Sequence, residues 1–378
     1  MEIGIITFHA SYNCGSILQC LALETVLEQK NQTVSIINFS NEEQQKLYSV
    51  FYKKKNIKNI VKNILCLPGK NKISNHYNQY QKYIDYKFKL SGKPFKTSEE
   101  LSENLQKFDM LIAGGDQVWN VKADDSDSAY FLDFATNTYK ISYAPSLGAT
   151  NINNVVNKER YKNLLNDFND ISCREVNGKK WLEELTGRDV KLLLDPTLLL
   201  NKEEWKNKID STIKLPFEEE YIFYYAFSYS SENNEMIQRI AEKNNLKVVV
   251  IDSKQWYIKR LHRYKNFVLS EQTGPNAFLN FIEKSKYVMT TSFHGTVFSL
   301  IFHKKFIYIN GKNHEPTDDR TSFLLERLNL LNKYLYSENV NIDELNSTID
   351  YNSIDSMINE LKSESFKYLD DNIEKAKL

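Results

Sequence analysis

The stretch IGIITFHASYNCGSILQCLALETVLEQKNQTVSIINF, residues 3–39, decides the fold of this chain. An apolar run at residues 3–8 predicts a strand, and the loop that follows, residues 9–16, contains a glycine. Apolar residues then recur with helical spacing over residues 17–27, and residues 33–39 predict a second strand. A strand, loop, helix and strand in this order form a βαβ unit, which implies a parallel sheet.

The same alternation continues along the chain. In the first half, further strands are expected at residues 110–113, 141–144, 168–172 and 190–194. A polar stretch ending at Leu215 and Pro216 separates them from a second set, which has strands at residues 221–227, 247–251, 287–290 and 306–309 and helices at residues 232–243, 274–285 and 295–302. Two successive sets predict an α/β protein with two Rossmann-like lobes, residues 1–215 and 216–350, that face a cleft.

Two segments depart from the alternation. Residues 41–100 predict a helical insertion, and within residues 53–65 an apolar stripe alternates with lysines. This stripe can rest on the inner face of a membrane, as a peripheral contact, or pack on the first lobe. The tyrosines that follow can stack on sugar rings or fill the core. Residues 351–378 predict a charged amphipathic helix that can return to the first lobe.

The composition narrows the class of protein. The 378 residues carry 49 basic and 49 acidic side chains, so no net charge draws the chain to nucleic acid. The sequence contains no run of about 18 apolar residues and no signal-peptide pattern. The four cysteines form no CxxC pair, which is typical of reduced thiols. We therefore expect a cytoplasmic protein.

The loop after the first strand is the first candidate for a site, because ligands of open parallel sheets bind beyond the carboxyl ends of strands. His9, Asn13 and Gly15 are expected to line the cleft there. Alternatively, this loop only caps the helix, with Ser16 as the N-cap residue. Cys14, near the helix start, can have a lowered pKa or be an inert buried thiol.

The second and third candidates follow later strands of the first lobe. Gly114 and Gln117 flank Asp116, which could act as a base or a sugar ligand, or simply cap a turn. Arg174 offers a planar fork that suits a carboxylate or phosphate. Alternatively, Arg174 forms an ion pair with Glu175.

The remaining candidates belong to the second lobe. His294 stands between Ser292 and Gly295 at the start of an expected helix, where phosphate contact or proton transfer is possible. Arg320 can clamp an anion, whereas the adjacent pair Asp318 and Asp319 makes a poor metal site. We expect no metal and no cofactor. The sequence lacks the Walker, GxGxxG, HExxH and GxSxG motifs of kinases, dehydrogenases, zinc proteases and hydrolases.

Taken in order, these segments resemble the polysaccharide pyruvyl transferase family. The matching segments are Gly4-Ile-Ile-Thr-Phe-His9, Asn13 with Gly15, Leu18-Gln-Cys-Leu-Ala-Leu23, Ala113-Gly-Gly-Asp-Gln-Val-Trp-Asn120, Tyr130-Phe-Leu-Asp-Phe134, Ile141-Ser-Tyr-Ala-Pro-Ser-Leu-Gly148, Ile171-Ser-Cys-Arg-Glu175, Leu194-Asp-Pro-Thr-Leu198, Ser292-Phe-His-Gly295 and Asp319-Arg320.

The resemblance implies a glycosyltransferase-B-like pair of lobes, with the acceptor on the first and the donor on the second. It also implies transfer of a pyruvyl group from phosphoenolpyruvate to two hydroxyls of a free or lipid-linked saccharide, as a ketal, in surface polysaccharide synthesis. By this analogy His294 and Arg174 contact the donor. We expect Arg320 to supply a further cation, which the resemblance does not itself imply. Two other readings of the sequence stay open: a glycosyltransferase that uses a nucleotide-sugar, and a non-catalytic sugar-binding protein on the same fold.

Overall fold

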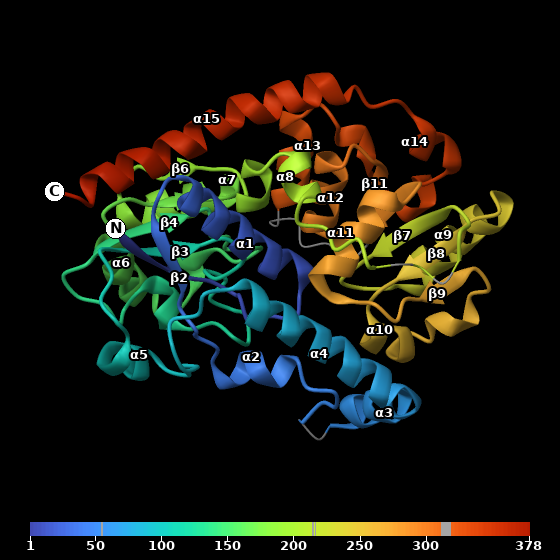
Figure 1. Ribbon diagram of the computed structural model, residues 1–378, viewed down its shortest axis with the longest axis horizontal. Coiled ribbons are helices and arrows are strands. Elements are labelled where there is room, and N and C mark those ends of the chain that lie inside the picture. Colours follow the sequence, from blue (N-terminus) through green and yellow to red (C-terminus); the bar gives the residue numbers. More distant parts are fainter. Residues whose placement is uncertain (54–55, 214, 216, 311–318) are drawn as a thin grey trace.

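The computed structural model describes residues 1–53, 56–213, 215, 217–310 and 319–378, and it contains two parallel sheets (Figure 1). The first sheet has the strand order β2-β1-β3-β4, formed by β1 (Glu2–Ile6), β2 (Thr33–Ile36), β3 (Met110–Gly114) and β4 (Tyr139–Tyr143). The short pair β5 (Ser172–Cys173) and β6 (Lys191–Leu192) continues it beside β4, where the Ser142 amide donates to the Asp170 carbonyl at 3.2 Å. The helices of this half are α1 (Cys14–Gln29), α2 (Glu42–Leu47), α3 (Ile57–Cys66), α4 (Lys70–Lys87), α5 (Ser98–Asn104), α6 (Lys158–Asn166), α7 (Val176–Thr186) and α8 (Lys202–Lys206).

The second sheet has six parallel strands in the order β12-β11-β10-β7-β8-β9, which is the strand order of the Rossmann fold. Its strands are β7 (Tyr221–Tyr225), β8 (Lys247–Val250), β9 (Phe267–Leu269), β10 (Tyr287–Thr290), β11 (Lys305–Asn310) and β12 (Tyr334–Tyr336). Its helices are α9 (Ser231–Lys243), α10 (Ser253–Ile258), α11 (Gly274–Lys284), α12 (Phe293–Ile301), α13 (Arg320–Arg327) and α14 (Ile342–Asn346), before the long α15 (Tyr351–Lys375). The expected α/β fold with two Rossmann-like lobes is confirmed.

The strand expected at residues 168–172 is largely wrong. Only Ser172 and Cys173 form β5, and Phe168 instead packs its ring edge-on against Trp119, with centroids 5.7 Å apart. Apolar character at Phe168 therefore reflects core packing after α6, and the sequence does not distinguish this from strand pairing.

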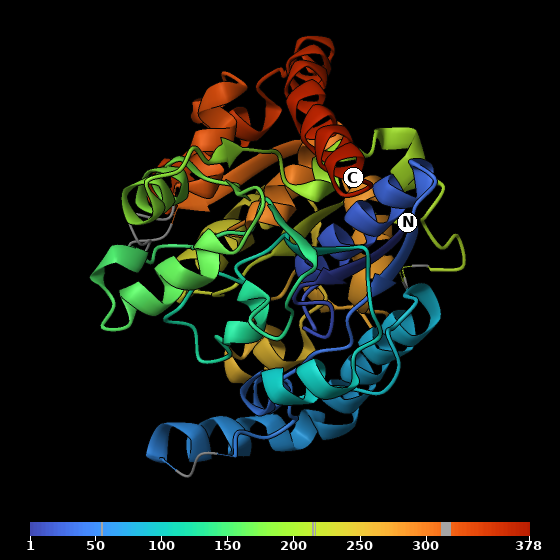
Figure 2. The ribbon, with the colours of Figure 1, turned by 90° about the vertical axis from the view of Figure 1, so that its left-hand side faces the viewer.

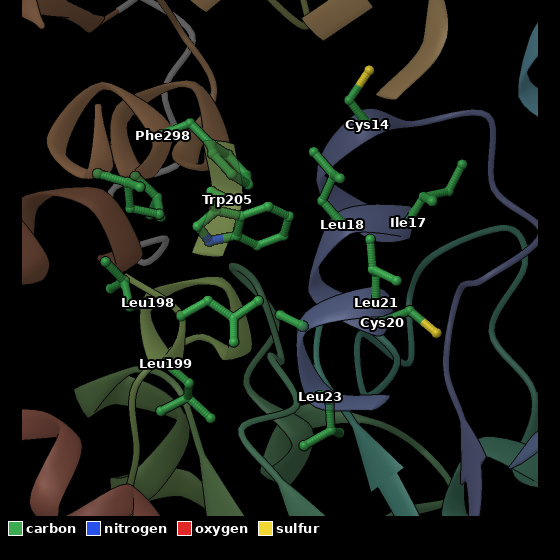
Figure 3. Close-up of a cluster of buried hydrophobic side chains, with 14 of the residues drawn as sticks. Cys14, Ile17, Leu18, Cys20, Leu21, Leu23, Leu198, Leu199, Trp205 and Phe298 are labelled. Atoms are coloured by element: carbon green, nitrogen blue, oxygen red, sulfur yellow. The ribbon is translucent and has the colours of Figure 1, made fainter. Parts of the chain in front are cut away.

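Helix α1 lies between the two sheets and is buried on nearly all sides. Figure 3 shows Leu18 and Leu21 opposite Trp205, whose ring packs on Phe298 of α12 with centroids 4.9 Å apart. The Trp205 indole N–H donates to the carbonyl of Thr197 at 3.0 Å, so this large side chain is buried without an unpaired donor. One core cluster thus joins α1 to the helices of the second sheet.

The segment α2–α4 runs along one long side of the molecule and contacts both halves (Figures 1 and 2). The Gln79 side chain accepts from the Thr273 amide at 2.9 Å and donates to the Glu271 carbonyl at 3.0 Å. The hydroxyl of Tyr80 lies 3.0 Å from the Cys14 thiol of α1. Residues 41–100 therefore connect the two halves rather than lying on the first alone.

Helix α15 runs along the opposite long side (Figures 1 and 2). Near its start, Asp355 lies 3.0 Å from His303, which follows α12. Further along, the Tyr368 hydroxyl donates to the Ser142 carbonyl at 2.9 Å, and the Ser365 hydroxyl accepts from the Leu194 amide at 3.2 Å. The last segment of the chain thus packs on strands of the first sheet.

Candidate active site

In each sheet the strand order reverses at one point, which lies between β1 and β3 in the first sheet and between β7 and β10 in the second. The two sheets present their carboxyl ends to each other there. Ligands of open α/β sheets bind at such points. The Tyr225 hydroxyl at the end of β7 lies 3.5 Å from Oδ1 of Asn13, the N-cap residue of α1. The loops after all four strands therefore converge.

Asp195 is the centre of the polar cluster at this place. Its Oδ2 lies 2.8 Å from Nη2 of Arg174 and 3.3 Å from Nε2 of His294, while Oδ1 accepts from the Thr197 amide at 2.9 Å. Burial alone would raise the pKa of this carboxyl, but the charges of Arg174 and His294 and the hydrogen bonds of His294 and Thr197 hold it well below its ordinary value. Asp195 is therefore an ionised carboxylate in a buried site.

Two arginines approach the ring of Phe293. The guanidinium carbon of Arg174 lies 5.1 Å from the ring centroid and that of Arg320 lies 5.9 Å from it, within the range of cation–π attraction. The side chain of Arg174 is 2% exposed, and its Nε and Nη1 have no hydrogen-bond acceptor within the described part of the chain. A buried guanidinium with unused donors is suited to an anionic ligand.

Gln117 connects the loop after β3 to Arg320 of α13. In the orientation that satisfies the hydrogen-bonding groups around it, the carboxamide oxygen of Gln117 accepts from Nη1 of Arg320 at 2.8 Å and from Nη2 at 2.6 Å. Close by, the Asn177 amide donates to Oδ2 of Asp319 at 3.3 Å. Asp318 lies outside the described residues.

His294 occupies the first turn of α12 because the local sequence builds a tightly packed helix start. Ser292 is the N-cap residue and accepts from the Gly295 amide at 3.4 Å. A side chain at Gly295 would meet the Thr290 hydroxyl at 2.2 Å, and one at Gly15 would meet Nδ1 of His294 at 2.1 Å. Ser292 and Gly295 therefore shape the turn, and Gly15 leaves the space that His294 fills.

The remaining candidates of the first lobe lie around the start of α1 but outside the Asp195 cluster. The Asp116 carboxylate accepts from the hydroxyl of Ser16, and its backbone has a φ of 47°, in the left-handed region. His9 is buried beside Asn38, and this burial lowers its pKa to about 4, so it is neutral at pH 7. Gly114 packs against Leu23.

Three alternatives drawn from the sequence are corrected by these contacts. Asn13 caps α1 in place of Ser16, with its side chain accepting from the Gly15 amide at 2.9 Å. Arg174 pairs with Asp195 and not with Glu175, whose Oε1 accepts from the Leu147 amide at 2.7 Å. The third is the packing of the apolar stripe of residues 53–65 on the first lobe, since Ile57, Ile60, Val61 and Ile64 of α3 are exposed.

Burial raises the pKa of the Cys14 thiol to about 12, despite hydrogen bonds with Tyr80 and Tyr225. The thiol is therefore protonated at neutral pH and is not a nucleophile.

Asp195 and Phe293 lie in segments that resemble the family, but neither was expected as a site residue from the sequence. The signal for Asp195 was present, since an Asp-Pro pair directly follows an expected strand of the first lobe. Its partners, however, are 21 residues before it and 99 after it, so their convergence follows only from the packing of the sheets. Phe293 resembles any core aromatic in the sequence.

A small cavity of about 20 Å³ adjoins the cluster and is lined in part by Arg174, Asp195, Phe293 and Arg320. This volume holds about one water molecule, so a larger ligand requires the surrounding side chains to move apart. A larger hollow of about 650 Å³ lies at the amino ends of β7 and β10, beside Tyr221 and Lys286. That is the opposite end of the sheet from the one at which α/β proteins bind ligands.

This arrangement can do two things chemically. Arg174 and Arg320 can hold an anion away from bulk water, where charge-assisted hydrogen bonds are strong. His294, positioned by the Asp195 carboxylate 3.3 Å from its Nε2, can contact an anion or transfer a proton. Among the described residues, no group of three or more His, Cys, Asp or Glu could hold a metal ion, and no helix is long and apolar enough to cross a membrane.

Comparisons with known proteins agree with this geometry. Residues 13–313 match the family model described as polysaccharide pyruvyl transferase, whereas no curated protein matches. Among solved structures, a putative UDP-N-acetylglucosamine 2-epimerase from Listeria monocytogenes is similar, with 14% identity and a TM-score of 0.54 over 94% of this chain and 90% of that one. The UDP-GlcNAc 2-epimerase from Neisseria meningitidis, solved with UDP-GlcNAc, gives 12% identity and a TM-score of 0.52 over 97% and 100% of the two chains. These likenesses show the glycosyltransferase-B-like fold.

Proposed function

We propose that this chain, which belongs to the polysaccharide pyruvyl transferase family, moves a pyruvyl group from phosphoenolpyruvate to two hydroxyls of a saccharide in the cytoplasm. The family and the fold make the chain a transferase that acts in polysaccharide modification. The identity of the donor, the ketal product and a role in surface polysaccharide synthesis are the parts that we propose.

The reaction balances without a further reactant. A proton adds to the methylene carbon of phosphoenolpyruvate, which gives cationic character to the carbon that bears the phosphate. One sugar hydroxyl adds to this carbon, and phosphate leaves with the electrons of its C–O bond. The second hydroxyl then closes the ring, and of the two hydroxyl protons one replaces the proton taken up by the methylene and the other leaves with phosphate. The protein must therefore bind two anionic groups and move protons.

The observation that carries the proposal is the buried Arg174, whose Nε and Nη1 have no acceptor among the described residues. Its planar fork suits the carboxylate or the phosphate of the donor, and Arg320, against the same phenylalanine ring, suits the other group. His294, held by Asp195, is the proposed phosphate contact or acid. The Asp195 carboxylate, whose Oδ2 lies 3.3 Å from Nε2 of His294, fixes the position of this ring.

We propose that the acceptor lies on the side of the first lobe, near the start of α1. Asp116, buried beside Ser16, is the candidate base or sugar ligand there. Asn13, Gly15 and Gln117 shape the same loops. The free or lipid-linked saccharide would enter from this side.

A thermal-shift panel with phosphoenolpyruvate, UDP, CDP and GDP tests the donor. A ligand at about 100 times its dissociation constant should stabilise the fold by about 2.7 kcal/mol. We expect a shift with phosphoenolpyruvate and none with the nucleotides. In Arg174→Lys the charge remains but the fork is lost, so the shift should disappear while the unliganded protein still unfolds cooperatively.

The matched control is Arg160→Lys. The side chain of Arg160 is 60% exposed and lies 3.6 Å from Asp133, so it differs from Arg174 in being a surface arginine. This variant should keep the full shift. A shift with a nucleotide would instead favour a nucleotide-sugar glycosyltransferase, and no shift with any of the four ligands would favour a non-catalytic sugar-binding protein.

A further inference from the structure

Helix α3 is an amphipathic helix that turns its apolar face outward. Five of its large apolar side chains, counting Leu67 directly after its end, are between 48% and 83% exposed: Ile57, Ile60, Val61, Ile64 and Leu67. In Figures 1 and 2 the helix forms an outer extremity of the molecule, beside the amino end of α4. Neighbouring apolar side chains in such number on one helix face mark an interaction surface.

The opposite face of α3 attaches the helix to the protein. Asn63 accepts from the Tyr52 amide at 2.8 Å and donates to the Tyr52 carbonyl at 3.0 Å, and Cys66 is fully buried. Lys62 extends over the Tyr52 ring, 4.9 Å from its centroid. The polar face is thus used in packing, so the exposure of the apolar face is a fixed feature of this segment.

The charge around α3 identifies the partner. Residues 44–84 contain no Asp or Glu, in a chain that has 49 acidic and 49 basic side chains overall. The same segment contains nine lysines: Lys46, Lys53, Lys54, Lys55, Lys58, Lys62, Lys70, Lys72 and Lys82. Lys46 pairs with Glu42 and Glu43, and Lys72 lies 3.9 Å from Glu271, so this surface is basic but not purely so. An apolar stripe on a helix that also carries Lys58 and Lys62 complements anionic lipid headgroups over an acyl boundary. A second copy of the chain would instead bring lysines against lysines.

We propose that α3 lies on the surface of an anionic lipid bilayer, with its apolar stripe in the headgroup region and its lysines against lipid phosphates. Apolar insertion and electrostatic attraction are the two signals that together hold a protein at a membrane reversibly. This contact is independent of the reaction assigned to the cleft.

Co-sedimentation with vesicles tests the contact. The full chain should bind vesicles that contain phosphatidylglycerol at least ten times more strongly than vesicles of phosphatidylcholine alone, and the binding should weaken as NaCl is raised. Ile60→Ser/Ile64→Ser and, separately, Lys58→Glu/Lys62→Glu should each lower the partition coefficient about tenfold or more. All four side chains belong to α3. Thermal unfolding should show that both variants fold as the parent does.

The matched control is Val156→Ser/Leu331→Ser, which removes two exposed apolar side chains elsewhere on the surface, 101% and 47% exposed. This control should bind vesicles as the parent does. Equal binding to both kinds of vesicle, or variants of α3 that bind unchanged, would overturn the proposal. A dimer in size-exclusion chromatography that the Ile60→Ser/Ile64→Ser variant abolishes, without lipid binding by the parent, would also overturn it. None of these outcomes depends on the response to phosphoenolpyruvate.

Discussion

Asp195 balances the charge of the candidate site, since its carboxylate lies between Arg174 and His294 with no exposure to solvent. Replacing it by a neutral side chain leaves a buried guanidinium without its counter-ion. Removing one partner of a buried pair costs about 3–5 kcal/mol, because the remaining charge is uncompensated. The residue is thus important for stability whatever ligand the cleft binds.

Asp195→Asn should therefore lower the free energy of unfolding by about 3–5 kcal/mol at pH 7. Because the pKa of Asp195 is depressed in the fold, its contribution is present above the unfolded pKa of about 3.9 and is lost as the pH falls toward the folded value. Urea unfolding of both proteins between pH 7 and pH 3 should show the difference narrowing in acid. The control is Asp370→Asn, at an exposed pair with Lys30, which should lower the free energy of unfolding by less than about 1 kcal/mol. If the loss for Asp195→Asn stays constant with pH, the charge assigned to Asp195 is wrong.

At the residue scale, the sequence predicts those parts of the site that follow from local position. Arg174 and His294 come directly after expected strands, so their place at the carboxyl edge follows from the topology of a parallel sheet. The contact between Gln117 and Arg320 does not, because it joins residues of different sheets. Sequence periodicity contains no information on which loops of two lobes meet.

The helices α1 and α12 meet with their amino ends, and Gly15 is the point of contact. A Cβ at this position would lie 2.1 Å from Nδ1 of His294, well inside contact distance. The φ angle of Gly15 is not in the left-handed region, so space alone explains the glycine. His294 is in turn held by Asp195, and it has little room to withdraw.

Gly15→Ala should thus destabilise the protein by about 1–3 kcal/mol through overpacking. In the double variant Gly15→Ala/His294→Ala the clash is removed, so the combined loss should be smaller than the sum of the two single losses by about 1 kcal/mol or more. Urea unfolding of the four proteins gives the coupling energy. Strictly additive losses would show that Gly15 is required for another reason.

At the element scale, the sequence predicts buried strands well and edge strands poorly. Strand β10 is found with its bounds at Tyr287 and Thr290, because a short apolar run between two apolar helices has few other interpretations. Strands β9 and β12 were missed, since they are three residues long and lie at the two edges of the second sheet. Edge strands bury less of their surface, so their sequences need not be apolar.

On the scale of the whole molecule, the two lobes share a core. One continuous cluster contains Leu18 and Leu23 of α1 together with Phe278 and Phe298 of the second lobe. The segment α2–α4 and helix α15 add connections on the two long sides (Figure 1). A lobe that unfolds alone would therefore expose apolar surface of the other.

We expect the chain to unfold in a single transition for this reason. Trp119 reports on the core of the first lobe and Trp256 on that of the second. Two variants, each keeping one of these tryptophans and carrying Phe at the other three tryptophan positions, should show the same urea midpoint, equal to that of far-ultraviolet circular dichroism in the same variant. Midpoints that differ between the probes within one variant would show that the lobes unfold separately.

The packing of α15 on the first sheet has a consequence for the synthesis of the protein. The Leu194 amide bonds to Ser365, 171 residues later, and Ser142 to Tyr368, 226 residues later. A ribosome that adds about 5–20 residues per second needs about 10–35 s to make the chain between Leu194 and Ser365. During this interval the nascent first lobe lacks the contacts that α15 makes with β4 and with the segment after β6.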